Sequence, residues 1–180
     1  MPPNVIFIGD AMVGKTTIVK CIVENKCYPK KYLESYISTV AKEMYTVKIN
    51  GRNVILHDMA GQPRWSELCE PYYKHAKLAV ICFNASDKDS FHSVHKWVTK
   101  FQTFNDWTPF IVVGNRIGTK TCKATLEVYD TLYVDCVDMK TIDALKGRIA
   151  ATLPEDEPEE NNFLLRISDF GTYVPAPRCW

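Results

Sequence analysis

Short apolar runs alternate with longer stretches of mixed polarity along the first 150 residues of the chain. The runs are typical of strands that are buried on both faces of a parallel sheet, and they occupy residues 4–8, 78–83 and 110–114. In the stretches between them, apolar residues recur every three or four positions. This spacing predicts amphipathic helices at 15–24, 88–104 and 139–151. A further short strand is expected at 131–135.

A different pattern occupies residues 43–58. The sequence EMYTVKINGRNVILHD alternates between polar and apolar positions and is interrupted at Asn50-Gly51. Asn-Gly between two alternating segments is the strongest short signal for a β-hairpin. We therefore expect an α/β fold with a six-stranded, mostly parallel sheet, one antiparallel hairpin strand and helices on both faces. A polar, tyrosine-rich loop at 26–38 precedes the hairpin.

The length of 180 residues is enough for one domain with a full core. Charge is unevenly distributed along it, because residues 1–153 hold 20 Lys and Arg against 15 Asp and Glu, whereas residues 154–180 hold 2 against 6. We expect a domain at 1–153, an acidic linker with the sequence PEDEPEE at 154–160, and a C-terminal tail at 161–180.

The composition also argues against several classes of function. Basic residues are not clustered with aromatic ones, which argues against nucleic-acid binding. No apolar run approaches the length of about 18 residues that a membrane span needs, and the opening MPPNVIF does not read as a secretion signal. Seven scattered cysteines without a C-x-x-C pair predict free thiols in a reducing compartment, so we expect a cytoplasmic protein.

The strongest chemical signal lies between the first expected strand and the first expected helix. Residues 9–16 read GDAMVGKT, which fits the pattern G-x-x-x-x-G-K-[ST]. Glycines let such a loop curl so that its N–H groups, and the positive end of the next helix, face phosphate oxygens. Lys15 is expected to neutralise the β- and γ-phosphates, and the Thr16 hydroxyl to bind Mg²⁺. The predicted phosphate-binding residues are Gly9, Asp10, Ala11, Val13, Gly14, Lys15, Thr16 and Thr17.

With these residues in view, residues 4–151 resemble the Ras superfamily of small GTPases, and most closely its Rab branch. GDAMVGKTT is similar to the family's first phosphate loop, SYISTV to its first switch, and HDMAGQPRW to its D-T-A-G-Q-E-R-F segment. Several motifs in the family's order and spacing are far more specific than one. The resemblance implies a P-loop GTPase domain that binds GTP or GDP together with Mg²⁺.

The resemblance also implies roles for single residues. Thr39 would bind Mg²⁺ and the γ-phosphate through its backbone, and Asp58 would hold the Mg²⁺ through water. Gly61 would sense the γ-phosphate, and Gln62 would orient the attacking water as the catalytic residue. Pro63 stands where the family usually has glutamate. Because proline biases the residue before it away from helical geometry, we expect slow hydrolysis.

The residues that would read the base depart from the family's pattern. The family reads guanine with N-K-x-D, and this chain has GNRIG. Asn115 is kept, Arg116 replaces the lysine that covers one face of the base, and Gly118 replaces the aspartate that accepts hydrogen bonds from guanine. Loss of a charged acceptor predicts weaker binding and poorer discrimination against adenine.

Other base contacts are also changed. The family's S-A-K segment reads C-V-D here, beginning at Cys136, so that only the backbone N–H of Val137 is kept. Tyr32 matches the aromatic residue that stacks on the base, and Tyr36 is a further candidate for cofactor binding. Only 21 positions separate Asn115 from Cys136, fewer than in most relatives, so we expect the intervening helix to be short or missing.

The resemblance places effector contacts on a switch surface at Met44, His57 and Tyr72, where two of the three residues differ from the usual aromatics. At the other end of the chain, Cys179 is one residue from the terminus rather than four, so no prenylation motif and no direct membrane anchor are expected. The apolar segment at 161–174 could pack on the domain itself or on a partner. We expect a monomer or a subunit of a complex.

Two hypotheses follow from these observations. The first is a Rab-like small GTPase, a Mg²⁺-dependent switch with slow hydrolysis that acts in vesicle or protein transport. The second is a pseudo-GTPase, in which the fold serves as a binding module and nucleotide binding is weak or relaxed. The intact phosphate motifs favour the first hypothesis, and the altered base-reading residues favour the second.

Overall fold

Six strands form a single sheet in the computed structural model, which describes residues 1–29, 39–117 and 129–155. Their order across the sheet is β2-β3-β1-β4-β5-β6. The strands are β1 (Asn4–Ile8), β2 (Lys42–Ile49), β3 (Arg52–Met59), β4 (Leu78–Asn84), β5 (Phe110–Asn115) and β6 (Thr131–Val134). The strands pair in parallel except for β2 and β3, which pair in antiparallel fashion. The expected α/β fold is confirmed.

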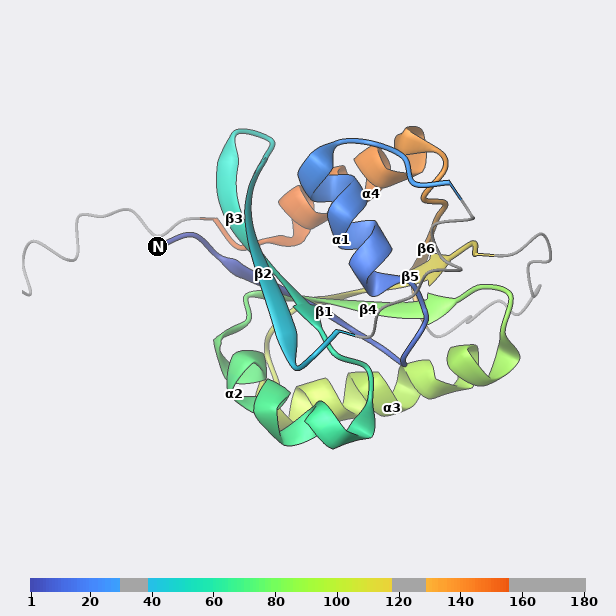
Figure 1. The fold of residues 1–180 in the computed structure, drawn as a ribbon. Coiled ribbons are helices and arrows are strands. Elements are labelled where there is room, and N and C mark those ends of the chain that lie inside the picture. The colour runs from blue at the N-terminus through green and yellow to red at the C-terminus, as the bar shows by residue number, and fades with distance from the viewer. Residues whose placement is uncertain (30–38, 118–128, 156–180) are drawn as a thin grey trace, which may run out of the picture.

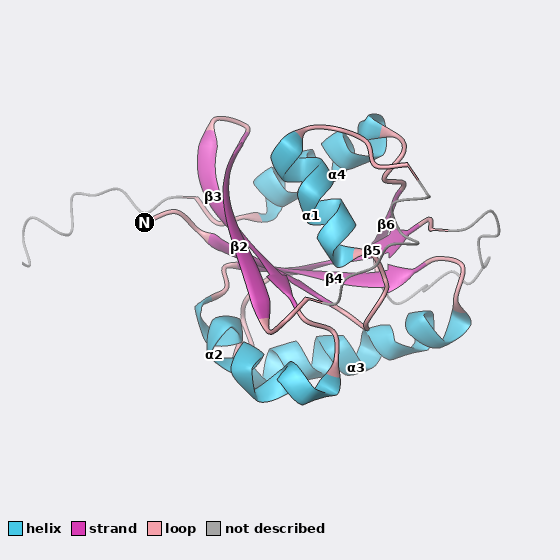
Figure 2. Ribbon diagram, viewed as in Figure 1, coloured by secondary structure: helices cyan, strands magenta, loops and turns pink. Residues whose placement is uncertain are grey.

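Helices cover both faces of this sheet (Figure 1). They are α1 (Lys15–Glu24), α2 (Ser66–His75), α3 (Lys88–Phe104) and α4 (Met139–Thr152). The pair α1 and α4 lies on one face and the pair α2 and α3 on the other (Figure 2). None of the helices in the described part of the chain has the length and apolar content that crossing a bilayer needs.

The hairpin turns where the sequence predicted. Asn50 and Gly51 both have positive φ, 47° and 85°, which is the backbone of a type I′ turn. Such a turn matches the natural twist of the two strands that it joins. It fixes the register that pairs Lys42 with Met59 at the open end of the hairpin, close to the carboxyl end of β3.

The strand β1 divides the core into two layers. Val5 and Phe7 are buried in the cluster beneath α1 and α4, whereas Ile6 and Ile8 are buried in the cluster beneath α2 and α3. All four are at most 1% exposed. A strand buried on both faces explains the unbroken apolar run. The same burial holds the end of β1 in place, and the candidate phosphate loop begins there, at residue 9.

The structure adds one helix that the apolar pattern did not predict. A short 3₁₀ turn at Pro63–Trp65 leads into α2, which contains Pro71. Proline removes a helical hydrogen bond, and only Cys69 and Tyr73 of this helix are buried, so its sequence carries a weak signal. Tertiary contact stabilises its end, because Nδ2 of Asn105 donates to the carbonyl of Tyr73 at 3.3 Å and to those of two neighbours.

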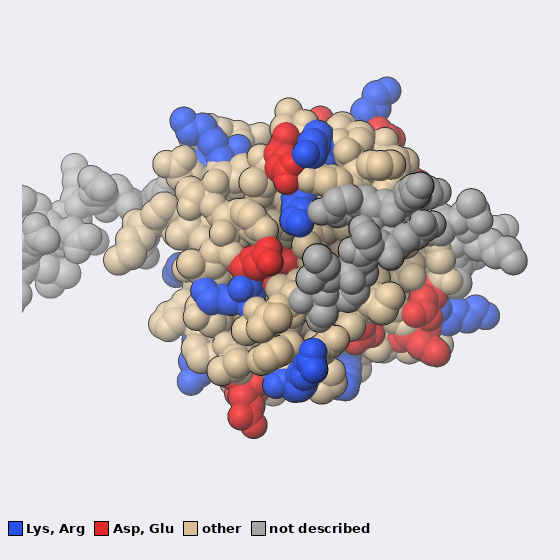
Figure 3. Space-filling view, viewed as in Figure 1, with Lys and Arg blue, Asp and Glu red and all other residues tan. Residues whose placement is uncertain are grey.

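Several expectations concern residues outside the described parts of the chain. The linker expected at 154–160 is described only at Pro154 and Glu155, and the tail at 161–180 is not described. The same holds for the segment 118–128, where a short or missing helix was expected. On the face drawn in Figure 3, basic and acidic side chains are interspersed, in line with the mixed composition.

Candidate functional site

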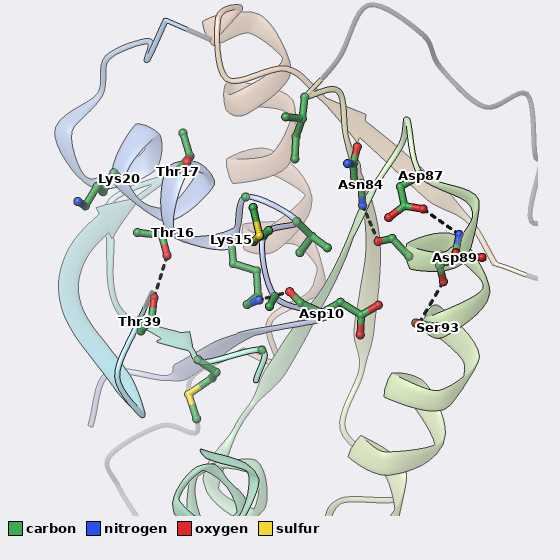
Figure 4. Close-up of a pocket in the computed structure, with 18 residues that line it drawn as sticks. Asp10, Lys15, Thr16, Thr17, Lys20, Thr39, Asn84, Asp87, Asp89 and Ser93 are labelled. Atoms are coloured by element: carbon green, nitrogen blue, oxygen red, sulfur yellow. Dashed lines mark hydrogen bonds between the residues drawn. The ribbon is translucent and has the colours of Figure 1, made fainter. Parts of the chain in front are cut away.

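A pocket of about 830 Å³ lies at the carboxyl ends of the central strands, around the loop between β1 and α1 (Figure 4). Ligands of open parallel sheets bind at this edge. The loop contributes one wall, and the segment between β4 and α3 contributes the opposite one. The lining residues are Asp10, Ala11, Met12, Val13, Gly14, Lys15, Thr16, Thr17, Lys20, Thr39, Met59, Gly61, Asn84, Asp87, Asp89, Ser90, Ser93 and Ile117.

Close packing fixes the course of the loop. Gly9 has a φ of 141°, and a Cβ there would lie 2.1 Å from the carbonyl oxygen of Cys82. Gly14 has a φ of 87°, and its Cβ would lie 2.2 Å from Nδ2 of Asn115. That same amide nitrogen donates to the carbonyl of Val13 at 3.1 Å. Only glycine fits at Gly9 and Gly14, and Asn115 fixes the loop between them.

Lys15 is the buried cation of the pocket, with 6% of its surface exposed. Its Nζ donates to the carbonyls of Gly9 at 3.0 Å and Asp10 at 2.6 Å, so the side chain folds back over the loop. Burial lowers the pKa of Lys15, and the charge of Asp58 is among the influences that oppose this shift. A buried ammonium that faces a pocket is suited to bind an anion.

The first turn of α1 adds a second anion-binding feature. The helix begins after Gly14, and no side chain in the described chain caps its N-terminus. Free N–H groups and the positive end of the helix dipole therefore face the pocket. Met12 lies beside them with a left-handed φ of 65°, unusual for a residue other than glycine, and with 66% of its surface exposed.

Three oxygen-bearing side chains meet next to this anion site. Oγ1 of Thr16 donates to Oδ2 of Asp58 at 2.6 Å, and Oγ1 of Thr39 reaches the same oxygen at 3.3 Å. The two hydroxyls are 3.1 Å apart. The three residues come from α1, from the chain before β2 and from β3, so only the fold brings them together.

The environment of Asp58 fits a hard cation. The residue is fully buried, and its Oδ1 has no hydrogen-bond partner among the described residues. Burial raises the pKa of the Asp58 carboxyl, because the charged form loses its hydration there, and this effect outweighs the opposing influence of the Thr16 hydroxyl and the Lys15 charge. A carboxylate with a free oxygen beside two hydroxyls matches the oxygen ligands that Mg²⁺ prefers. The residues expected to hold Mg²⁺ therefore fit the ion.

The segment after β3 packs directly on the loop. A Cβ on Gly61 would lie 2.4 Å from the carbonyl carbon of Asp10 and 2.5 Å from the backbone nitrogen of Ala11. Gln62 has an extended backbone, with φ −82° and ψ 135°, as expected for a residue before proline. Its Oε1 is buried and has no hydrogen-bond partner within the described ranges. Gly61 therefore packs against the loop, and the side chain of the next residue, Gln62, has an oxygen that is available to a further hydrogen-bond donor.

The base-reading candidates are less well assembled. Asn115 is 1% exposed and contacts the loop from behind, and neither Asn115 nor Arg116 nor Val137 is among the described residues that line the pocket. The guanidinium carbon of Arg116 lies 5.5 Å from the centre of the Tyr133 ring. The N–H of Val137 already donates to Oδ1 of Asp135 at 3.1 Å. The other three candidates, Tyr32, Tyr36 and Gly118, lie outside the described residues.

The second wall of the pocket was not predicted from the sequence. Asp87 caps α3 by accepting from the N–H of Asp89 at 3.0 Å, and the Ser90 hydroxyl accepts from the N–H of Asn84 at 2.9 Å. These contacts hold the start of α3 against the end of β4. The sequence did contain one signal for these residues, which is their position directly after a buried parallel strand. Binding residues gather at the carboxyl edge of such a sheet. This wall carries the carboxylates of Asp87 and Asp89, whereas the opposite wall carries both Lys15 and Asp10.

Two of the three expected switch-surface residues are accessible. Met44 is 56% exposed, and Tyr72 is half-buried with Nζ of Lys42 4.0 Å from its ring centre. His57, expected at the surface, is instead only 5% exposed, because it faces Tyr72 at 5.7 Å and contacts Oδ1 of Asn4 at 2.9 Å. Burial lowers the pKa of His57 to about 4.

Comparison with known proteins gives a consistent result. Residues 4–148 match the Ras family. The Ypt/Rab-type GTPase ypt71 of Schizosaccharomyces pombe is 32% identical over 137 residues, which cover 72% of this chain and 64% of that protein. Ras-related protein Rab-21 of Geodia cydonium is 30% identical over 140 residues, covering 76% and 60%. Ras-related protein Rab-9B of Homo sapiens is 28% identical over 135 residues, covering 71% and 66%. The matches therefore span less than two thirds of these relatives' lengths.

Proposed function

The chain belongs to the Ras family, and from this membership we propose that it is a Rab-like small GTPase, a Mg²⁺-dependent switch that binds GTP and GDP. One observation carries the proposal. The hydroxyls of Thr16 and Thr39 meet the buried carboxylate of Asp58, and both threonines line a pocket of about 830 Å³ together with Lys15. A cation site next to an anion site is what a nucleotide with bound Mg²⁺ requires.

In this proposal two neighbouring groups of residues at the loop have different tasks. Lys15 and the N–H groups at the start of α1 would bind the phosphates, while Thr16, Thr39 and Asp58 would hold the Mg²⁺, which neutralises phosphate charge. Thr39 and the segment from Gly61 onward would then be the parts that differ between the GTP and GDP states. Their contact with the loop supports this role, because a group added to the bound nucleotide would meet them first.

We propose that hydrolysis is slow in the isolated protein. Gln62 has an extended backbone because Pro63 follows it, which limits how its side chain can approach a water molecule. Among the described residues, no arginine lines the pocket. An arginine supplied by an activator raises the rate of related enzymes by about 10³ to 10⁵. Turnover would therefore depend on a partner protein.

The base-reading residues favour the second candidate function, a nucleotide-binding module with relaxed specificity. The Val137 N–H is bonded within its own turn, and the Arg116 guanidinium lies near Tyr133. Gly118 also cannot supply the carboxylate that guanine recognition uses in the family. Under this alternative the fold would persist as a binding component of a larger assembly, with weak nucleotide binding.

The cellular role is proposed from the resemblance alone. We propose that the protein acts in the cytoplasm, in vesicle or protein transport, and that effectors and regulators bind near Met44 and Tyr72. The exposure of Met44 supports this choice of surface. Fractionation of cells that express the full chain would test the compartment, and recovery solely with integral membranes would contradict it.

The nucleotide that co-purifies with the protein separates the two candidate functions. The protein is denatured, and the released nucleotide is identified by chromatography, with Lys15→Ala purified in parallel. Stoichiometric GDP or GTP in the wild type, absent from the variant, is the expected result. Recovery of adenine nucleotides would refute the guanine switch and favour the relaxed binding module. Recovery of no nucleotide, together with no GDP binding in titrations with Mg²⁺, would lead to the same conclusion.

A further inference from the structure

A hydrogen bond joins helix α3 to the phosphate loop. Nε1 of Trp97 donates to Oδ1 of Asp10 at 2.8 Å, although 87 residues separate the two in the chain. Trp97 is half-buried and packs against the core cluster beneath α2 and α3. Indole N–H groups act only as donors, so this contact gives the carboxylate a fixed and oriented partner.

The position of Asp10 makes its orientation important. Its own carbonyl accepts from Nζ of Lys15 at 2.6 Å, and the residue lines the pocket, so it borders the candidate phosphate site. Figure 4 shows the Asp10 carboxylate on the side of Ser93, away from Lys15. Phosphate oxygens and a carboxylate repel each other, most strongly where water is scarce. A carboxylate free to turn toward the phosphates would weaken their binding.

The indole of Trp97 is itself held in place. Nζ of Lys100, one turn further along α3, lies 5.7 Å from the centre of the Trp97 ring and 5.6 Å from that of Tyr73. The same ammonium contacts Oγ of Ser66 at the start of α2. A ring fixed by packing on one side and by a cation on another can direct its N–H to one acceptor.

We propose that Trp97 is a positioning residue that turns the Asp10 carboxylate away from the bound phosphates and so prolongs nucleotide binding. This inference rests on the proposed function. Trp97 acts through Asp10 and does not itself line the pocket. Loss of one charge-assisted hydrogen bond at a half-exposed site is expected to speed nucleotide release about three- to tenfold.

The contact can be tested without measuring nucleotide binding. In a ¹H–¹⁵N correlation spectrum, the indole signal of Trp97 is assigned by its absence in Trp97→Phe. Asp10→Ala is expected to shift that signal toward the position of the Trp107 indole, which belongs to a side chain that is 95% exposed. The Trp107 signal should stay in place. An unmoved Trp97 signal would overturn the proposal.

The function of the contact is tested by a double-mutant cycle on the release of a fluorescent GDP analogue. Trp97→Phe should release it about three- to tenfold faster than wild type, whereas Trp107→Phe should not. In the Asp10→Ala background, Trp97→Phe should have no further effect, because no carboxylate remains to be oriented. Equal acceleration in both backgrounds would mean that the indole only packs, and would refute the proposal.

Different results would refute the proposed function and the role of Trp97. A wild-type protein that binds no guanine nucleotide would refute the proposed function and, with it, any role of Trp97 in nucleotide retention. Normal GDP binding with an unmoved indole signal, or with no coupling between Trp97 and Asp10, would refute the role of Trp97 alone.

Discussion

The hydroxyl of Thr16 donates to Oδ2 of Asp58 across 2.6 Å, although 42 residues separate them in the chain. This bond joins the first turn of α1 to the end of β3. It satisfies one carboxylate oxygen and leaves Oδ1 buried without a partner in the described chain. A buried carboxylate of this kind costs stability without a cation and favours binding of one.

Replacement of Asp58 should therefore separate stability from function. Asp58→Asn keeps the shape and removes the charge, so the nucleotide-free protein should become more stable, because burial disfavours the charged carboxylate in the folded state. Nucleotide release from the variant should no longer be accelerated by EDTA, whereas EDTA should speed release from wild type at least about tenfold. Denaturant unfolding and release kinetics measure the two effects, with exposed Asp106→Asn as the control. A destabilised variant that still responds to EDTA would contradict this account.

The pH dependence of the same residue has a defined sign. Folding raises the pKa of Asp58 above its ordinary value of 3.8. At a pH between the ordinary and the raised pKa, the folded state therefore binds more protons than the unfolded state. The nucleotide-free, metal-free protein should lose stability through this group as the pH rises through that window. Asp58→Asn should reduce this loss when the free energy of unfolding is measured from pH 4 upward. If the free energy of unfolding changes with pH as steeply in the variant as in the wild type, groups other than Asp58 determine the pH dependence.

Lys15 should carry most of the binding energy for phosphates. Lys15→Ala removes the buried ammonium from the pocket, and nucleotide affinity should fall at least about a hundredfold, because each hydrogen bond to a charged group contributes about 1.5–3 kcal/mol. Lys96→Ala, an exposed change on α3, is the matched control. Calorimetric titration with GDP and Mg²⁺ measures both variants. Equal affinities would refute the phosphate site.

Two glycines offer a matched test of close packing at the loop. Gly61→Ala would place a Cβ within 2.5 Å of backbone atoms of the loop, so nucleotide binding should weaken and the free energy of unfolding should fall by about 1–3 kcal/mol. The Cβ that Gly147→Ala adds would have no atom within 4 Å, and residue 147 lies inside α4. This substitution should therefore raise the free energy of unfolding by about 0.5–1 kcal/mol. Calorimetric melting compares them, and a harmless Gly61→Ala would contradict the packing.

Base specificity can be tested by restoring the missing acceptor. Gly118→Asp is expected to tighten binding of guanine nucleotides by about tenfold or more and to increase their preference over ATP. Competition of a fluorescent GDP analogue with GTP and ATP measures both effects, and Gly147→Asp controls for the added charge. If neither affinity nor preference rises, the base is not bound beside residue 118.

Hydrolysis should be slow and should depend on Gln62. Single-turnover measurements on protein loaded with GTP are expected to show a slow rate in wild type and a rate about tenfold lower in Gln62→Leu. Gln102→Leu, an exposed change near the end of α3, is the control. Fast turnover by the isolated protein would refute the slow switch. A slow rate that Gln62→Leu leaves unchanged would favour the binding module.

Local sequence was enough to predict most of the fold. The strand at residues 4–8 is buried on both faces, so its apolar run needed no partner to be recognised. Asn50-Gly51 determined the hairpin, because both residues readily adopt positive φ. The helix α2 escaped prediction, since Pro71 weakens its signal. Its end is stabilised by the side chain of Asn105, which lies 29 to 32 residues further along the chain than the carbonyls that it contacts, so only the fold brings them together.

For the candidate site, the sequence by itself determined the chemical types: a lysine, hydroxyls, a carboxylate and glycines at fixed spacings. Only the tertiary structure decided which of them meet, because hydrogen bonds act over about 3 Å whereas the residues lie tens of positions apart. It joined Thr16 to Asp58 and buried His57, which the sequence had suggested for the surface. It also brought Trp97 to Asp10, a contact that depends on how α3 packs against the sheet and that no local pattern encodes.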